Sequence, residues 1–244
     1  MLNKLLLATL GTTLISLQAT SAAQAVSFSE FDTGIYKDAG STLTTAEVIS
    51  GSPNQSLDSI GGFLDLNTNG LYDADLFKIR LTGSGNFSAT ITGGTRDGNN
   101  TPAEAVAQLF LFDSAGNGIY GHDSTLPANN PLTPVAPGEY FLGITQTGLA
   151  PSFRPVSSFN REDFIFPNGD TLVGPKPNVG SLYDFEPGSL RDAIGKPPVS
   201  YEINLTGATP VPEPSSALAV ITLGAVGAIA KFGKKGGSFT RTPL

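Results

Sequence analysis

The sequence predicts an all-β protein built as an antiparallel β-sandwich. Its 244 residues include 29 Gly and 18 Pro, whereas charged residues make up only 14%. This composition is typical of short strands joined by tight turns. Between about residues 26 and 209 the apolar side chains recur with a period of two, as expected for strands with one buried face.

Five segments carry this pattern. Four of them alternate apolar and polar residues, namely 75–83, 86–94, 138–148 and 200–208. In the first, Phe77, Ile79 and Leu81 share one face. The fifth, AQLFLFD at 107–113, is apolar on both faces, which indicates a strand inside a sheet. Gly-rich turns separate the segments, and this arrangement favours a sandwich over a βαβ protein.

The first 25 residues are predicted to be a secretory signal peptide. Lys4 supplies the positive start, residues 5–17 form an apolar stretch, and Ala23 and Ala25 give the small-x-small cleavage pattern. Signal peptidase would then cut after Ala25, and Val26 would begin the exported chain.

The C-terminal region combines a Pro-rich box, an apolar stretch and a basic cluster. As a helix, residues 215–232 would extend over about 27 Å, close to the ~30 Å of a bilayer core. Lysines at its far end fit the positive-inside rule. The sequence therefore predicts a membrane-spanning segment at 215–232. The box and the basic cluster comprise Val211, Pro212, Glu213, Pro214, Lys231, Lys234 and Lys235.

This order of features at 211–235 resembles the PEP-CTERM sorting signal, and residues 236–244 follow it as a short tail. The resemblance implies that an exosortase processes the membrane-held precursor. It also implies delivery to the cell envelope, the cell surface or the extracellular matrix. A permanent single-span anchor is the alternative.

Residues 41–148 resemble the bacterial pre-peptidase C-terminal (PPC) domain of cyanobacterial surface proteins. The segments that carry the likeness are DADLFKIRLTG, AQLFLFDSAGNGIYGHD and APGEYFLGITQTG. The resemblance implies a jelly-roll-like sandwich over 41–209, after a lead-in at 26–40. It further implies a non-catalytic module, and some modules of this family bind calcium or polysaccharide.

An acidic stretch precedes the strand at 75–83. Asp65, Asn67 and Asn69-Gly70 match half of an EF-hand loop, but position twelve is Leu76 and a strand follows, so an EF-hand is excluded. Two interpretations stay open. The side chains can solvate a turn, or Asp73 and Asp75 can bind calcium with Asp65 or an upstream acid such as Glu47.

A Pro/Gly/Asn-rich insertion at 149–198 carries six aromatic residues. Its rings can pack on the sandwich, or they can form a polysaccharide-binding strip centred on Phe164 and Phe166.

Several function classes are disfavoured. The chain has no cysteine, which excludes thiol catalysis, and its only histidine, His122, lacks the pattern of a catalytic triad. Residues 26–210 hold nine Lys and Arg against twenty Asp and Glu, a net charge of −11 that disfavours nucleic acid. We therefore expect a non-catalytic structural or adhesive surface protein that needs no cofactor, with calcium as a candidate ion. A polysaccharide-binding module is the alternative, and a secreted hydrolase a remote one.

Overall fold

The computed structural model shows an all-β protein, as predicted. It describes residues 24–30, 38–52, 54–65, 74–96, 100–103, 106–146, 152–153, 172, 174–175, 182–184 and 198–213. Within these ranges there is no α-helix. The predicted signal peptide up to Ala23 and the predicted span at 215–232 lie outside them.

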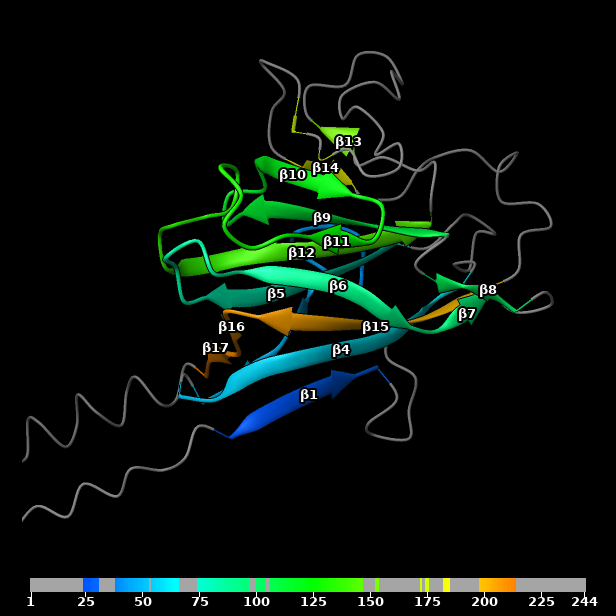
Figure 1. Ribbon diagram of the computed structural model, residues 1–244, viewed down its shortest axis with the longest axis horizontal. Helices are drawn as coiled ribbons and strands as arrows, with labels where there is room; N and C mark the ends of the chain where they lie inside the picture. The colour runs from blue at the N-terminus through cyan, green and yellow to red at the C-terminus, as the bar shows by residue number, and fades with distance from the viewer. Residues whose placement is uncertain are drawn as a thin grey trace, which may run out of the picture.

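One main sheet has seven strands and contains both N-terminal and C-terminal segments (Figure 1). Its order is β1 (Ala25–Ser29), β4 (Ser56–Leu64), β15 (Val199–Thr206), β6 (Ser88–Gly93) and β11 (Thr125–Leu126). In addition, β7 (Thr95–Arg96) pairs with β15, and β8 (Thr101–Pro102) pairs with β7.

The other main sheet has six strands. Its order is β10 (Gly118–His122), β9 (Ala107–Asp113), β12 (Gly138–Gln146), β5 (Ala74–Leu81) and β16 (Ala208–Thr209), with β2 (Glu47–Val48) on β5. Two small sheets join β3 (Ser50–Gly51) to β17 (Val211–Pro212), and β13 (Ser152–Phe153) to β14 (Leu182–Asp184).

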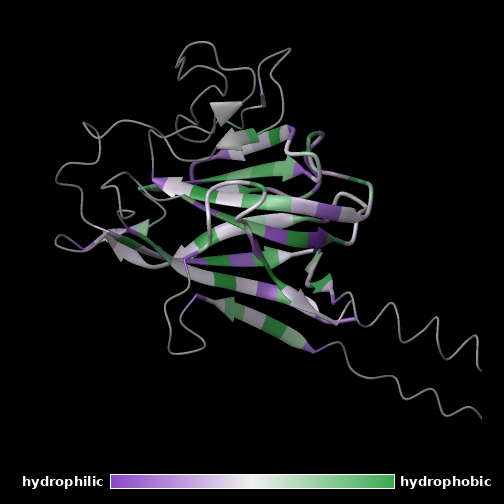
Figure 2. Cartoon of the chain, turned by 180° about the vertical axis from the view of Figure 1, so that it is seen from behind, coloured by the Kyte–Doolittle hydropathy of each residue, from purple (hydrophilic) through white to green (hydrophobic). Residues whose placement is uncertain are grey.

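The main hydrophobic core lies between the two large sheets. Phe77, Ile79 and Leu81 of β5 are fully buried there, as the alternation predicted, and they pack in one cluster with Ile203 and Leu205 of β15. Burying each such side chain contributes about 1.5–3 kcal/mol. Figure 2 shows hydrophobic and hydrophilic residues alternating along the strands.

The prediction that all strands pair antiparallel was wrong in part, because the sheets contain both antiparallel and parallel pairs. β1 pairs with β4 in parallel, β2 with β5, and β17 with β3. Period two reports which face of a strand is buried but carries no information on direction. All three pairs add a strand of five residues or fewer, after a connection too long for a hairpin.

A second apolar cluster covers the outer face of the six-stranded sheet. Phe110, Phe112 and Phe141 lie there with Leu76, and Leu182 of β14 packs over them with 4% of its surface exposed. The backbone N–H of Leu182 also donates to the carbonyl of Gly116 at 2.7 Å. β9 is thus buried on both faces inside its sheet, as predicted, and β14 anchors part of the 149–198 insertion.

The chain passes from one large sheet to the other at Gly207. This residue has a φ of +70°, a conformation that glycine adopts without steric cost. The turn separates β15 from β16, which pairs with Leu81 and Arg80 of β5. The start of β1 and the end of β17 lie at the same end of the molecule (Figure 1).

Candidate functional site: a buried carboxylate cluster

Three carboxylates from separate segments meet at the edge of the core. Each of Glu30, Asp38 and Asp75 places one oxygen within 4.8 Å of the others. Glu30 directly follows β1, and Asp75 is the second residue of β5. Glu30 and Asp75 expose 2% and 0% of their surfaces, whereas Asp38 is exposed. The cluster is therefore buried on the side of Glu30 and Asp75 and open to solvent on the side of Asp38.

Glu30 holds two chain segments through its carboxylate. The backbone N–H of Ala39 donates to Oε1 at 2.9 Å, and that of Phe63 donates to Oε2 at 3.0 Å. The backbone N–H of Glu30 itself donates to the carbonyl of Gly61. One side chain thus holds both the segment next to Asp38 and the end of β4 in place, and these bonds are stronger when Glu30 is ionised.

Asp75 is bonded across the core to the opposite sheet. The hydroxyl of Tyr201, on β15, donates to Asp75 Oδ2 at 2.5 Å. Gly62 of β4 leaves the space for this contact, because a Cβ there would overlap both the Tyr201 hydroxyl and Glu30 Oε2. A glycine on the inner face of a strand often marks such a close approach.

Burial raises the pKa of Glu30 from its ordinary value of 4.5 to about 7. The hydrogen bonds from Ala39 and Phe63 oppose the shift, while the negative charges of Asp38 and Glu47 add to it. Near neutral pH the carboxyl group is therefore close to half-protonated. Either a proton or a bound cation can relieve the repulsion among these acids.

The donor set fits a hard divalent cation. All three side chains offer carboxylate oxygens, which Ca²⁺ and Mg²⁺ prefer, and Ca²⁺ tolerates irregular sites better than Mg²⁺. Glu30, Asp38 and Asp75 would hold the ion, while the charge of Glu47 adds attraction. The residue types thus suit calcium more than a transition metal.

Of the calcium ligands predicted from the sequence that the structure describes, only Asp75 is placed in the cluster. Asp75 lies in the cluster, and Glu47 lies close enough for its charge to act on Glu30. Asp65 is exposed after β4 and does not belong to the group found among the described residues. Asp73 lies outside the described ranges.

Sequence reasoning missed Glu30 and Asp38, because no fixed spacing connects them with Asp75. One signal was present for Glu30. In VSFSE, period two places position 30 on the same face as Val26 and Phe28, and an acid on an apolar face marks a buried polar group.

Among the described residues, no other residue predicted from the sequence belongs to this carboxylate group. Ala25 is the exposed first residue of β1, and His122 Nδ1 accepts the N–H groups of Ser124 and Thr125 at 3.4 and 3.3 Å, which closes a turn. Several lie outside the described residues, namely Ala23, Phe164, Phe166, Pro214, Lys231, Lys234 and Lys235.

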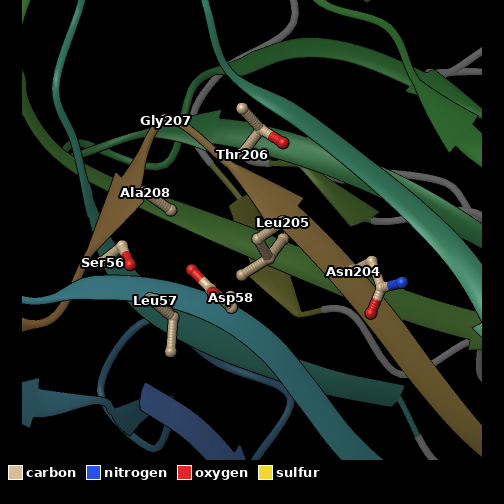
Figure 3. Close-up of a pocket in the computed structure, with 8 residues that line it drawn as sticks. All are labelled: Ser56, Leu57, Asp58, Asn204, Leu205, Thr206, Gly207 and Ala208. Carbon is tan, nitrogen blue, oxygen red and sulfur yellow. The ribbon is translucent and has the colours of Figure 1, made fainter. Parts of the chain in front are cut away.

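An open groove of about 560 Å³ lies elsewhere, between the start of β4 and the end of β15 (Figure 3). The two strands pair up to Asn204 and Ser59 and separate beyond that point. Asp58, Asn204 and Thr206 line the groove with exposed polar side chains.

No protein family, curated protein sequence or solved structure matches the chain. The resemblances at 41–148 and 211–235 therefore stay predictions. Among the described residues, no helix has the length and hydropathy that a membrane crossing requires.

Proposed function

We propose that this chain is an exported, non-catalytic surface or matrix protein whose jelly-roll-like β-sandwich is stabilised by calcium. The observation that carries the calcium part of the proposal is the cluster of Glu30, Asp38 and Asp75, two of them buried. A bound Ca²⁺ would reduce this negative charge and tie the segments around Glu30 and Asp38 to the start of β5. The role of the ion would be structural, because two of its ligands already connect parts of the fold. Glu30 accepts hydrogen bonds from Ala39 and Phe63, and Asp75 accepts one from Tyr201.

The proposed export and location rest on the two targeting signals predicted at the ends of the chain. The signal sequence up to Ala25 would export the chain, and the 211–235 signal would hold it at the membrane for exosortase processing. The start of β1 and the end of β17 lie at the same end of the fold, so both signals attach to that end (Figure 1). The opposite end is then free to face the surroundings of the cell. Polysaccharide of the matrix is the expected neighbour.

Thermal unfolding tests the calcium proposal. The chain is melted at pH 8 in calcium and in chelator, beside Asp38→Asn, which removes an exposed ligand without opening the core. Calcium at 100 times the Kd should stabilise the fold by about 2.7 kcal/mol. Asp38→Asn should lose most of this gain. Glu202→Gln, an exposed acid of β15 outside the cluster, is the matched control and should keep it.

Identical melts of the wild-type chain in calcium and chelator would reject calcium stabilisation. An equal response in Asp38→Asn and Glu202→Gln would place the ion somewhere other than this cluster.

A polysaccharide-binding function is the second candidate, and the groove between β4 and β15 favours it. Asp58, Asn204 and Thr206 offer acceptors and donors to the hydroxyl groups of a sugar chain. Affinity electrophoresis in extracellular polysaccharide should show retardation that Asn204→Ala with Asp58→Ala reduces. Equal mobility with and without polysaccharide would exclude this function.

A further inference from the structure

The last described strand contains half of the predicted sorting motif. β17 consists of Val211 and Pro212, which pair in parallel with Ser50 and Gly51 of β3. The side chain of Val211 is 7% exposed, and its backbone N–H donates to the carbonyl of Ile49 at 2.7 Å. Glu213, the next residue, is exposed.

The docking of β17 reaches the main core through Ile49. This residue is 4% exposed, belongs to the main hydrophobic cluster, and donates its N–H to the carbonyl of Lys78 on β5 at 3.2 Å. Pro210 is buried just before β17, and a Cβ on Gly51 would lie 2.9 Å from the Cβ of Pro210. The backbones therefore approach closely, and Gly51 permits it.

We infer that the folded domain withholds Val211 and Pro212, so that an enzyme can read the sorting motif only after β17 detaches. The inference rests on the proposed sorting function. An enzyme that binds a short motif as an extended peptide uses the backbone groups and alternate side chains of that peptide. In the fold, Ile49 already uses the Val211 N–H, and the Val211 side chain is buried.

Release of β17 is then a local opening that precedes processing. Such openings at the ends of a domain require far less free energy than global unfolding. A completely folded domain would release its tail slowly, and a loosened β3–β17 pair would release it faster. The stability of this small sheet, and not only the motif sequence, would set the rate of tail removal.

Two variants change the docking and leave residues 211–214 intact. Gly51→Val pushes its side chain against Pro210 and should loosen β17. Gly51→Cys with Pro210→Cys should tie β17 to β3 as a disulfide. The two Cβ atoms would start 2.9 Å apart and a disulfide holds them about 3.5–4.5 Å apart, so the two segments must separate slightly before the bond forms. Ser50→Ala, an exposed position of β3, is the matched control.

The test uses the purified full chain in detergent and a proline-specific endopeptidase as the probe. We expect hydrolysis after Pro212 to be at least fivefold faster in Gly51→Val than in the wild type and Ser50→Ala. The oxidised cysteine pair should be cut at least fivefold more slowly than its reduced form. Equal rates across all these forms would overturn the inference.

Intact mass of the same variants expressed in exosortase-containing cells separates this inference from the sorting proposal. Faster tail loss in Gly51→Val supports both. A tail retained in every variant, together with the expected endopeptidase rates, would reject sorting while supporting the withheld motif. If Gly51→Val, Ser50→Ala and the wild type lose the tail at the same rate, the result would support the sorting proposal and overturn the inference that docking of β17 limits processing.

Discussion

The hydroxyl of Tyr201 and the carboxylate of Asp75 form a 2.5 Å hydrogen bond that joins the two large sheets. Tyr201 is 3% exposed, and Asp75 is completely buried. The bond lies beside Glu30, whose carboxylate shares with Tyr201 the space above Gly62. Packing of the sheets and the geometry of the acidic cluster are therefore coupled.

Tyr201→Phe tests this coupling. The substitution removes the donor but keeps the ring, so Asp75 loses a hydrogen bond inside the protein. We expect a loss of about 1–3 kcal/mol in the free energy of unfolding, measured by urea denaturation in chelator. Tyr140→Phe is the control, because the Tyr140 hydroxyl bonds to the Ala136 carbonyl and is not part of the cluster. A loss in Tyr201→Phe no larger than in Tyr140→Phe would contradict a strong bond to Asp75.

Two adjacent glycines of β4 give a matched pair for the space around the cluster. A Cβ at Gly62 would overlap Tyr201 and Glu30, whereas one at Gly61 would find its nearest neighbour, the Tyr201 carbonyl oxygen, at 3.6 Å. Gly62→Ala should therefore lose about 1–3 kcal/mol of stability through overpacking. Gly61→Ala should stay within about 0.5 kcal/mol. Equal melting temperatures of the two variants would show that Gly62 does not confine the cluster.

The pH dependence of stability follows from Glu30. Its pKa is 4.5 when freely solvated and about 7 in the fold, so the native state binds the proton more tightly. Stability from this group is fully present below pH 4.5 and is lost as the pH rises towards 7, because ionisation then leaves a buried charge. The shift corresponds to about 3 kcal/mol at most.

Unfolding curves in chelator between pH 4.5 and 8 measure this effect. Other acids add their own slopes, so the comparison is with Glu30→Gln, which does not titrate. The wild type should lose stability relative to the variant as the pH rises. Parallel curves for the two proteins would contradict a raised pKa.

Leu182 tests whether the described part of the 149–198 insertion belongs to the fold. This side chain packs on Phe110, Phe112 and Phe141 and is 4% exposed. Leu182→Ala should cost about 2–5 kcal/mol, as for other buried leucines. Leu132→Ala is the control at a leucine that is 42% exposed, and its effect should be small. Similar small losses in both would show that β14 does not stabilise the sheet.

Much of the fold could be predicted because period two reports burial. The alternation in β5, β6 and β15 identified the residues of the main core, and the apolar β9 segment identified an interior strand. Strand direction could not be predicted, because it depends on long connections. The parallel β1–β4 pair, which places Glu30, carries no local signal of its direction.

The site was only partly predictable for the same reason. Asp75 stood out as an acid at the start of a strand whose inner face continues with Phe77 and Ile79. Its partners Glu30 and Asp38 precede it by 45 and 37 residues, and only the folded chain brings them together. Position 30 on an apolar face was the available clue, and it indicates burial without naming a partner.

Calorimetric titration of the chelator-treated chain with calcium at pH 8 tests the central claim most directly. The cluster predicts one ion per chain, with a Kd of about 10⁻⁴–10⁻³ M as in extracellular modules. Asp38→Asn should bind more weakly by tenfold or more, while Glu202→Gln should bind as the wild type does. Absence of a binding isotherm at millimolar calcium, or unchanged binding in Asp38→Asn, would contradict a calcium site at Glu30, Asp38 and Asp75.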